Sequence, residues 1–195
     1  MVSSQHIRAW DAEAERYDEP ADHGLGDPEV RFAWRALLLD LLPEPPARVA
    51  DLGCGTGTLS VLLADEGFEV VGVDFAPQML VMAHAKGFGR RHMGFVRGDA
   101  AAPPLKSAAW DVVLCRHVLW AMPDPAEALG RWVRLLRPGG RLVLVEGSWS
   151  TGVGLTADQT LGLVYGTGRS VRLVRLEDPA YWGRETGDER YAVVS

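Results

Sequence analysis

The sequence has few cysteines, no long hydrophobic run and no excess of positive charge. Its 195 residues include two cysteines, Cys54 and Cys115, without histidine pairs at ligand spacing, so a zinc site is not expected. No apolar run is long enough to span a membrane, and the first residues lack the apolar core of a secretion signal. We therefore expect a cytoplasmic protein, in which a disulfide is also not expected.

The charge balance narrows the class of protein further. Lys plus Arg is 20 and Asp plus Glu is 26, a formal net charge of −6. An acidic domain has no general electrostatic attraction for nucleic acid. Hydrophobic residues make up 47% of the chain, which excludes disorder and allows a sizeable core. We expect one domain over residues 1–195, with neither a nucleic-acid nor a membrane partner.

The rest of the chain is organised around a glycine-rich turn. The apolar run over residues 49–52 predicts a buried parallel strand, and Gly53, Gly55 and Gly57 then lead into a helix near Thr58. A strand, a glycine turn and a helix N-terminus form a cradle for a polar ligand. The third glycine comes one place earlier than in the dinucleotide pattern G-x-G-x-x-G. The turn alone therefore fits either a ligand loop or a helix cap.

A second expected strand, residues 69–74, ends in an acid. Asp74 follows the glycines by about 20 residues, where a doubly wound fold places a carboxylate that accepts hydrogen bonds from a ribose. Taken alone, this feature fits a nicotinamide dinucleotide as well as other nucleoside cofactors.

Four motifs in this order resemble those of the class I S-adenosylmethionine-dependent methyltransferases. The glycine turn resembles motif I, and residues 74–80, DFAPQML, resemble D-x-S-x-x-M-L with alanine in place of serine. Residues 98–100, GDA, and residues 136–142, LRPGGRL, resemble the family's G-D-A and L-K-P-G-G-x-L segments. The motifs cover residues 49–147. The resemblance implies S-adenosylmethionine as cofactor and S-adenosylhomocysteine as product.

Strands and helices alternate from Arg48 onward, which predicts an α/β fold with a doubly wound parallel sheet. The resemblance implies a Rossmann-like, seven-stranded sheet of order 3-2-1-4-5-7-6, with strand 7 antiparallel, over residues 46–195. It also implies that residues 1–45 form a helical lid. The expected strands are residues 48–52, 69–74, 94–97, 111–116, 141–146, 171–176 and 190–194, and the expected helices of the core are 58–66, 77–86, 125–136 and one that begins at the capping box 156–159.

Two helices are expected in the lid. One carries apolar residues at helical spacing as far as Tyr17, and a loop follows over residues 19–28 because of its glycines and prolines. A second helix is expected over residues 28–42, with proline in its first turn. Its expected core face is Phe32, Leu38, Leu39 and Leu42.

The resemblance also implies which residues contact the cofactor. The glycine loop wraps the methionine end, Asp74 binds the ribose, and Asp99 with Ala100 lies at the adenine. Tyr17 is similar to the tyrosine of a W/F-D…Y-D pattern, whose hydroxyl lies near the cofactor carboxylate; the alternative is a packing residue with its hydroxyl in water. The expected cofactor-binding residues are Tyr17, Asp51, Gly53, Gly55, Gly57, Asp74, Phe75, Met79, Asp99, Ala100 and Arg116.

Two of the five histidines are catalytic candidates. A hydroxyl or amine acceptor must lose a proton, and histidine is the commonest general base. His117 directly follows the fourth expected strand, beside the switch point, as a base or substrate contact; the alternative is packing or helix capping. His23 lies in the lid loop, where a solvated surface role is the alternative. No metal is expected, because the run Arg116-His117-Val118 contains no acid.

Three tryptophans, Trp120, Trp149 and Trp182, are expected at the pocket edge of the sheet. Rigid aromatic walls suit a flat apolar ligand, although these rings would also suit the lid interface. We therefore predict methyl transfer to a small-molecule acceptor, at a hydroxyl, in metabolite biosynthesis or tailoring, by a monomer or homodimer.

Three alternatives have different signatures. A non-catalytic, S-adenosylmethionine-binding partner or regulatory protein would share the cofactor site. A nicotinamide-dependent oxidoreductase would have its third glycine one place later and a catalytic Tyr/Lys pair, and neither is found. Methylation of nucleic acid or protein is disfavoured by the acidic balance, and the Asn/Asp-Pro-Pro-Tyr/Phe tetrapeptide of amino-group enzymes is missing after the fourth strand.

Overall fold

The structure is a computed structural model that describes residues 2–195. It contains seven strands, seven α-helices and two 3-10 turns in the described residues. The strands are β1 (Arg48–Leu52), β2 (Glu69–Asp74), β3 (Met93–Arg97), β4 (Trp110–Arg116), β5 (Leu136–Ser148), β6 (Arg172–Arg175) and β7 (Glu189–Val194). The helices are α1 (Ser4–Glu13), α2 (Ala21–Gly24), α3 (Pro28–Leu41), α4 (Thr58–Asp65), α5 (Pro77–Gly87), α6 (Pro125–Leu135) and α7 (Ala157–Tyr165), with 3-10 turns η1 (Leu119–Ala121) and η2 (Pro179–Tyr181).

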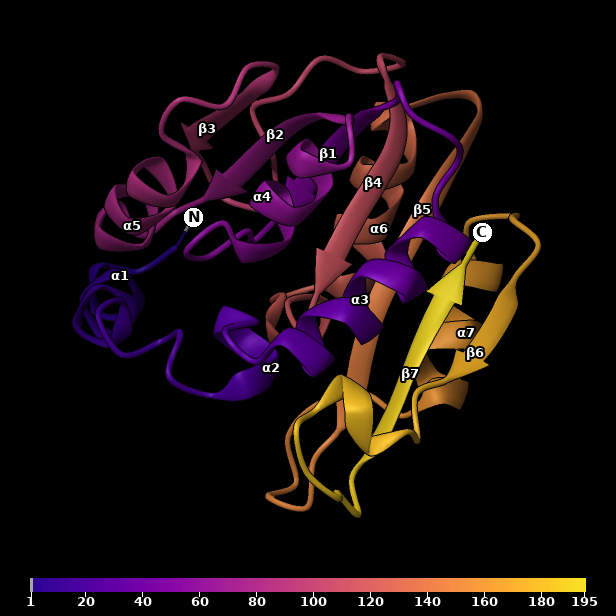
Figure 1. Cartoon of the computed structure of the whole chain (residues 1–195). Helices are drawn as coiled ribbons and strands as arrows, with labels where there is room; N and C mark the ends of the chain where they lie inside the picture. Colours follow the sequence, from indigo (N-terminus) through magenta and orange to yellow (C-terminus); the bar gives the residue numbers. More distant parts are fainter. Residues whose placement is uncertain (1) are drawn as a thin grey trace.

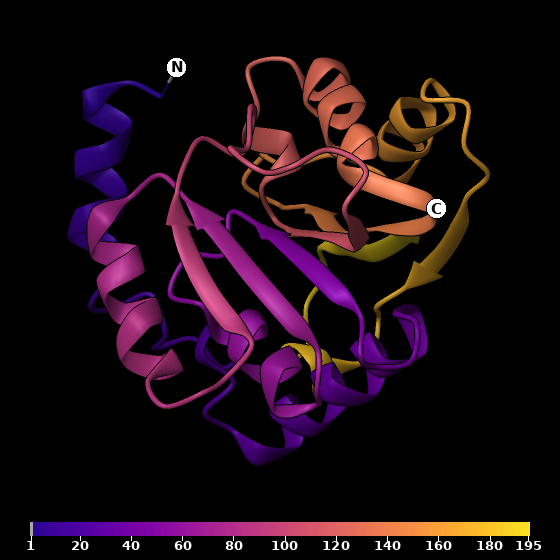
Figure 2. The same ribbon diagram turned by 90° about the horizontal axis from the view of Figure 1, so that it is seen from above.

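One sheet holds all seven strands in the order β3-β2-β1-β4-β5-β7-β6. Strands β1 to β5 pair in parallel, whereas β7 runs antiparallel to both β5 and β6. Helices α3 and α4 cover one face of the sheet and α6 and α7 the other, while α1 lies beside α5 (Figures 1 and 2). This arrangement confirms the predicted fold and strand order. The carboxyl ends of β1 and β4 are neighbours, which is the switch point of such a sheet.

The helix boundaries follow from local sequence signals. Asp27 accepts a hydrogen bond from the amide of Glu29 and caps α3 directly before Pro28. Thr156 and Gln159 form the predicted capping box of α7, each side chain accepting a hydrogen bond from the other's amide. These caps satisfy amide groups that would otherwise have no partner in the first helical turn.

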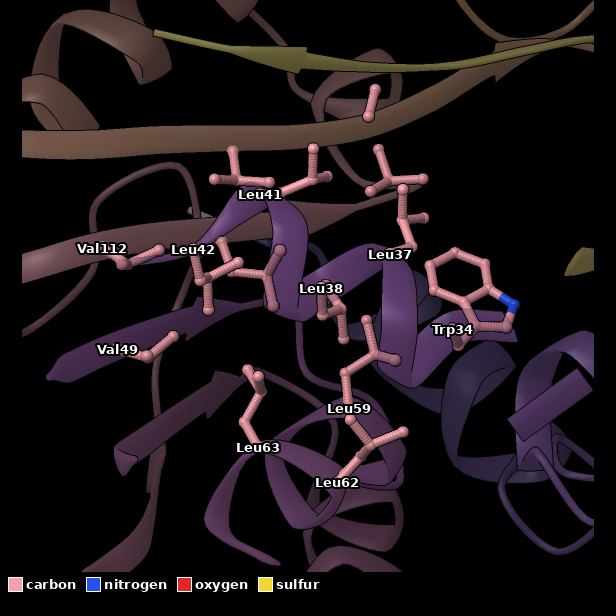
Figure 3. Close-up of a cluster of buried hydrophobic side chains, with 14 of the residues drawn as sticks. Trp34, Leu37, Leu38, Leu41, Leu42, Val49, Leu59, Leu62, Leu63 and Val112 are labelled. Atoms are coloured by element: carbon pink, nitrogen blue, oxygen red, sulfur yellow. The ribbon is translucent and has the colours of Figure 1, made fainter. Parts of the chain in front are cut away.

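The core has two layers, one on each face of the sheet. On one face, leucines of α3 and α4 pack on Val49 of β1 and Val112 of β4 (Figure 3). On the other, Val113 and Cys115 of β4 pack towards α6 and α7. The inner strands are buried on both faces, which is why they are near-continuous apolar runs rather than alternating ones.

The predicted core face of α3 was only partly right. Leu38 and Leu42 are buried as expected, but Phe32 is 69% exposed, whereas Trp34 is fully buried. Phe32 lies two positions from Trp34, about 200° around a helix with 3.6 residues per turn, so the two rings face opposite sides. The buried face of α3 is Val30, Trp34, Leu37, Leu38 and Leu41.

Leu38→Ala should lower the free energy of unfolding by about 2–5 kcal/mol, because it leaves a cavity among fully buried leucines. Phe32→Ala is the matched control on the exposed face of the same helix and should change stability by less than about 0.5 kcal/mol. Urea denaturation measures both. Equal losses in the two variants would contradict this packing of α3.

The segment predicted as a loop over residues 19–28 contains one short helix, α2. Its C-cap is Leu25, whose φ of 50° is left-handed and whose side chain is buried.

No helix within residues 2–195 is both long and apolar enough to cross a bilayer.

Candidate active site

The glycine turn after β1 is tied to the neighbouring strand. The amides of Gly53 and Cys54 donate to the carbonyl of Val73, at 2.8 and 3.1 Å. Gly53 has a φ of 72°, and a Cβ there would lie 2.4 Å from a methyl carbon of Val118. Glycine is therefore required at this position by backbone conformation and by packing. The turn is fixed against both β2 and the segment after β4.

Asp74, the last residue of β2, also fixes the turn. Its carboxylate accepts hydrogen bonds from the amides of Gly55 at 2.9 Å and Ala76 at 2.8 Å. Burial raises the pKa of Asp74, and these amide donors oppose the increase. An ionised carboxylate has about four acceptor positions, so these amides leave acceptor capacity for a further ligand.

Asp51, at the carboxyl side of β1, is a second buried acid. It accepts a hydrogen bond of 2.6 Å from the hydroxyl of Ser60. Burial raises the pKa of Asp51 to about 6. Near neutral pH this residue therefore places a carboxylate beneath the N-terminus of α4.

The N-terminal segment, residues 2–27, covers the glycine turn. The ring of Tyr17 lies 3.4 Å from the point where a Cβ of Gly55 would stand. Asp18 accepts a hydrogen bond of 2.6 Å from Thr56 and forms an ion pair of 2.6 Å with Lys86 of α5. These contacts join the segment to both the turn and α5.

Arg116 and His23 make further contacts with residues of the N-terminal segment, 2–27. Arg116 forms an ion pair of 3.2 Å with Asp22, while its Nε is buried without a hydrogen-bond partner. The imidazole of His23 stacks on the ring of Tyr17, at 4.6 Å between centroids. The cavity beside them is about 30 Å³ and is lined by Tyr17, His23, Asp51, Gly53, Cys54, Thr56, Thr58, Leu59 and Arg116.

His117 follows β4 in a left-handed conformation, with a φ of 56°. Its amide donates to the carbonyl of Val145, and its carbonyl accepts from the indole of Trp120, at 2.8 and 2.9 Å. Its imidazole meets Trp149 edge-on at 5.1 Å and stacks near Trp182 at 6.2 Å. Burial lowers the pKa of His117 well below 6.5, so the ring is neutral at pH 7, and its Nε2 is buried without a partner.

Trp182 departs from its predicted place at the pocket edge. It is 4% exposed, donates a hydrogen bond of 2.8 Å to the carbonyl of Leu176, and packs edge-on against Trp34. Trp182 therefore packs both against Trp34 in the core under α3 and against the ring of His117. Trp120 and Trp149 are half-buried, and their rings pack edge-on with 5.8 Å between centroids.

The other predicted cofactor residues lie beside the same end of the sheet. Met79 is buried in a small cluster that Tyr17 and Phe75 pack against. Asp99 accepts a hydrogen bond from the amide of Ala101 at 2.9 Å, and the carbonyl of Ala100 accepts one from the indole of Trp132 at 2.7 Å.

Glu146 has a positioning role that the sequence did not indicate. Its Oε1 accepts hydrogen bonds from the amides of Val118 and Leu119, at 3.1 and 2.8 Å, and so holds the turn that carries His117. Burial raises the pKa of Glu146 to about 8, so this side chain is largely protonated at neutral pH. An acid at the end of β5 was the available signal, but its use as a backbone acceptor depends on the pairing of β4 with β5.

Glu146→Gln should flatten the dependence of stability on pH. Between 4.5 and about 8 the folded protein keeps the Glu146 proton that the unfolded chain loses. The stabilisation is therefore complete at low pH and is lost as pH rises through the folded pKa, by up to about 1.4 kcal/mol per unit. Glutamine keeps the acceptor but does not ionise. Urea denaturation should show wild type losing stability relative to the variant from about pH 5 to pH 8; a constant difference would contradict this role.

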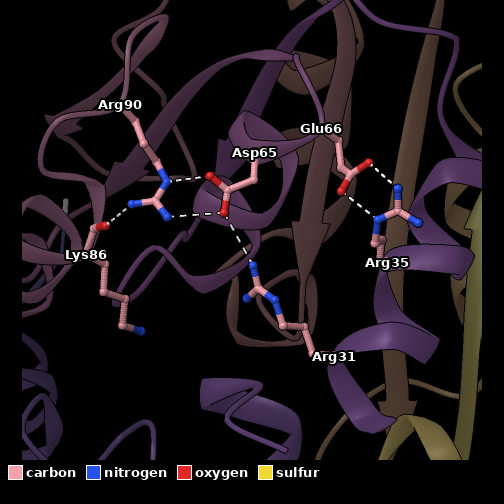
Figure 4. Close-up of polar contacts among 6 residues, drawn as sticks. All are labelled: Arg31, Arg35, Asp65, Glu66, Lys86 and Arg90. Atoms are coloured by element: carbon pink, nitrogen blue, oxygen red, sulfur yellow. Dashed lines mark hydrogen bonds and ion pairs between the residues drawn. The ribbon is translucent and has the colours of Figure 1, made fainter. Parts of the chain in front are cut away.

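Charged residues on the outside of α3, α4 and α5 pair with one another instead of facing the site (Figure 4). Asp65 forms ion pairs with Arg31 at 3.4 Å and Arg90 at 2.7 Å, and Glu66 pairs with Arg35 at 2.6 Å. This network offers control positions for tests of the site.

A larger groove, about 580 Å³, lies between the start of α6 and α7. No acidic, basic, histidine, cysteine or tyrosine side chain lines this groove, so it lacks the groups of an acid–base or nucleophilic site. In the whole of residues 2–195, not only in this groove, no group of three or more His, Cys, Asp or Glu side chains is arranged to hold a metal ion. The lining residues of the groove are Pro125, Ala126, Leu155, Gln159, Gly162, Leu163, Gly166 and Thr167.

Comparison with known sequences finds methyltransferases. A family model described as a methyltransferase domain matches residues 50–144. The demethylmenaquinone methyltransferase of Thermus thermophilus is 42% identical over 117 residues, covering 58% of this chain and 53% of the relative. That of Beutenbergia cavernae is 39% identical over 140 residues, covering 70% of this chain and 55% of the relative. The chain spans about half the length of the curated relatives it matches.

Solved structures share the fold over more of the chain. An S-adenosylmethionine-dependent methyltransferase from Thermotoga maritima has a TM-score of 0.73 at 19% identity, covering 97% of each chain. The complex of a Haloferax volcanii methyltransferase with the Trm112 activator gives 0.74 at 19% identity, covering 100% of this chain and 98% of the other. The cyclase SpnF gives 0.68 at 24% identity, covering 74% and 59%. At such identities the likeness establishes the fold alone.

Proposed function

We propose, because the chain belongs to the class I S-adenosylmethionine-dependent methyltransferases, that it transfers a methyl group from S-adenosylmethionine to a hydroxyl of a small molecule. One observation carries the proposal: the glycine turn, Asp74, Arg116 and His117 all lie at the carboxyl ends of β1, β2 and β4. Ligands of doubly wound sheets bind at this switch point.

The residues at this end suit the cofactor chemically. The N-terminus of α4 and the unpartnered Nε of Arg116 favour the carboxylate of an amino-acid tail. Asp51 and Asp74 offer carboxylate oxygens to an ammonium group and to ribose hydroxyls. We extend the proposed cofactor site to the other residues that the family resemblance implies, which are Tyr17, Gly53, Gly55, Gly57, Phe75, Met79, Asp99 and Ala100.

When bound, S-adenosylmethionine supplies a methyl group activated by a positively charged sulfur. The protein then has to align the acceptor, exclude water and take up the hydroxyl proton. His117 is proposed for the last task, because burial keeps it neutral and its Nε2 has no partner within the described chain. His23, which stacks on Tyr17, is the second candidate.

Of the predicted lid, residues 1–45, only the part before α3 is proposed to move, because Trp34, Leu38 and Leu41 of α3 are fully buried in the core. The cavity under Tyr17 and Arg116 is about 30 Å³, much smaller than the several hundred Å³ of ordinary cofactor sites. On this proposal the lid is closed here, and Tyr17 with its neighbours moves to admit a nucleoside. The ion pairs Asp18–Lys86 and Asp22–Arg116 are the contacts that opening would break.

Two alternatives have specific support. Relatives named demethylmenaquinone methyltransferases favour a quinone-derived ring as a second class of acceptor. The cyclase SpnF has the same fold, so the fold does not assign methyl transfer by itself. A non-catalytic cofactor-binding partner or regulatory protein is the remaining alternative.

A methyl-transfer assay tests the proposal. Purified protein is incubated with S-adenosylmethionine labelled in its methyl group and with a panel of phenols, aliphatic alcohols and reduced quinones. We expect label on an acceptor oxygen and an equal amount of S-adenosylhomocysteine. Binding of S-adenosylhomocysteine without transfer to any acceptor would contradict the enzyme in favour of the regulatory alternative, and label on ring carbon would favour the quinone-derived acceptor.

We propose that the protein acts in the cytoplasm as a monomer or homodimer on a flat, aromatic acceptor. Cys54 and Cys115 are both unpaired in the structure, as suits a reducing compartment. The half-buried rings of Trp120 and Trp149 beside His117 support the aromatic acceptor. Sedimentation velocity distinguishes the two assembly states.

A further inference from the structure

Arg190, at the start of β7, lies between two tryptophan rings. Its guanidinium carbon is 4.9 Å from the ring centroids of both Trp149 and Trp182. The residue is 7% exposed, and its Nε is buried without a hydrogen-bond partner. Asp188 balances part of the charge of Arg190 through an ion pair of 2.9 Å with Nη2, so Nε is the donor left for a further ligand.

The sheet makes room for this side chain with a glycine. Arg190 pairs with Gly147 of β5, and a Cβ on Gly147 would lie 3.0 Å from Cδ of Arg190. A larger residue at position 147 would therefore displace the arginine stem. Asp188 anchors the other end of the side chain, accepting a hydrogen bond of 2.9 Å from Nη2.

Arg190 and the catalytic candidate His117 contact the same two rings. His117 lies 5.1 Å from Trp149 and 6.2 Å from Trp182 between ring centroids. The charges of Arg116 and Arg190 both lower the pKa of His117, in addition to burial. Two guanidinium groups, each ion-paired on one side with an aspartate, therefore lie near His117 within apolar aromatic walls.

The proposed lid supplies one of these carboxylates. Asp22 of α2 forms an ion pair of 3.2 Å with Arg116 and also acts electrostatically on Arg190. If the lid opens as proposed, Asp22 leaves Arg116 and the two guanidinium groups lose this charge. An anion brought by a ligand would then replace the carboxylate of Asp22.

We infer that the methyl acceptor is an aromatic acid whose carboxylate is bound by Arg190 while its ring packs on the half-buried Trp149. This inference rests on the proposed function, because it names the substrate class of the same site. A planar guanidinium matches a carboxylate with two parallel hydrogen bonds and stacks on aromatic rings, which lysine does not do. A neutral acceptor, such as a quinone-derived ring, would offer Arg190 only an uncharged oxygen, whose hydrogen bond is weaker than the charge-assisted pair of a carboxylate.

Matched pairs of acid and amide test the inference. Benzoate, 2-naphthoate and indole-3-acetate, each with its neutral amide, are titrated by calorimetry into protein saturated with S-adenosylhomocysteine. We expect at least one acid to bind about 10-fold or more tighter than its amide, since a hydrogen bond to a charged group contributes about 1.5–3 kcal/mol. Amides that bind as well as their acids, or a panel in which no acid binds, would overturn the inference.

Variants assign the preference to Arg190. Arg190→Gln should remove the preference for acids, and Arg190→Lys, which keeps the charge without the planar fork, should reduce it and serves if the glutamine variant does not fold. Arg184→Gln is the matched control, because Arg184 is an exposed arginine close enough to lower the pKa of Arg190. A preference that persists in both Arg190 variants would also overturn the inference.

The same titrations, together with the assay of labelled methyl transfer, separate this inference from the proposed function. Failure of S-adenosylhomocysteine itself to bind would reject the cofactor assignment. Normal binding of S-adenosylhomocysteine, with methyl transfer only to neutral acceptors, would reject the aromatic acid and leave the methyltransferase intact.

Discussion

Asp74→Ala is expected to weaken the binding of S-adenosylhomocysteine by about 10²–10⁴-fold, because two hydrogen bonds to a charged acceptor contribute about 1.5–3 kcal/mol each. The carboxylate of Asp74 has acceptor positions left for a ribose, and it also accepts the amides of Gly55 and Ala76. The substitution removes the ribose acceptor and loosens the turn at the same time. Isothermal titration calorimetry measures the change.

Two further variants separate these effects. Asp74→Asn keeps one carbonyl oxygen and should show a smaller loss of affinity than the alanine variant. Asp65→Asn is the matched control, since Asp65 is an acid that pairs with Arg31 and Arg90 outside the site. Unchanged affinity in Asp74→Ala, or an equal loss in Asp65→Asn, would count against the assignment of Asp74.

His117→Asn is expected to lower kcat by about 10²–10⁴-fold, the usual contribution of a general base, while changing the affinity for S-adenosylhomocysteine by less than about 3-fold. Asparagine is chosen because it tolerates the left-handed backbone of position 117, whereas alanine there would add strain. Steady-state kinetics of labelled methyl transfer measure kcat, and calorimetry measures the affinity.

The pH profile gives a second test of His117. Because burial lowers the pKa of His117 well below 6.5, the base stays unprotonated in mildly acidic solution. The acid limb of kcat/KM should therefore lie below the usual histidine range in wild type and should disappear in His117→Asn. Full activity in the variant would reduce His117 to a packing residue.

The sequence predicts best where the signal is local. The glycine turn, the strand that ends at Asp74 and the capping box at Thr156 each depend on a few adjacent residues, and the fold contains all three. The sequence predicted less well which side of α3 faces the core, because Phe32 and Trp34 are both large aromatics on an amphipathic helix. Only contact with α4 and η2 decides which of them is buried.

The parts that could not be predicted depend on long-range pairing. Arg116 meets Asp22 across 94 residues of sequence, and no local spacing indicates that contact. Glu146 accepts the amides of Val118 and Leu119 only because β4 and β5 are neighbours. The sandwich of Arg190 likewise needs the antiparallel pairing of β5 with β7. The motifs thus point to the proposed cofactor site and the sequence also suggested His117 and its tryptophans, whereas Arg190 was recognised only from the tertiary structure.

A crystal structure with S-adenosylhomocysteine tests the central claim most directly. The account predicts the ribose hydroxyls within hydrogen-bond distance of Asp74, the amino-acid tail against Gly53 and Gly55, and Tyr17 displaced from its closed position. A nucleoside bound in the groove between α6 and α7, or elsewhere away from the carboxyl ends of β1 and β2, would contradict it.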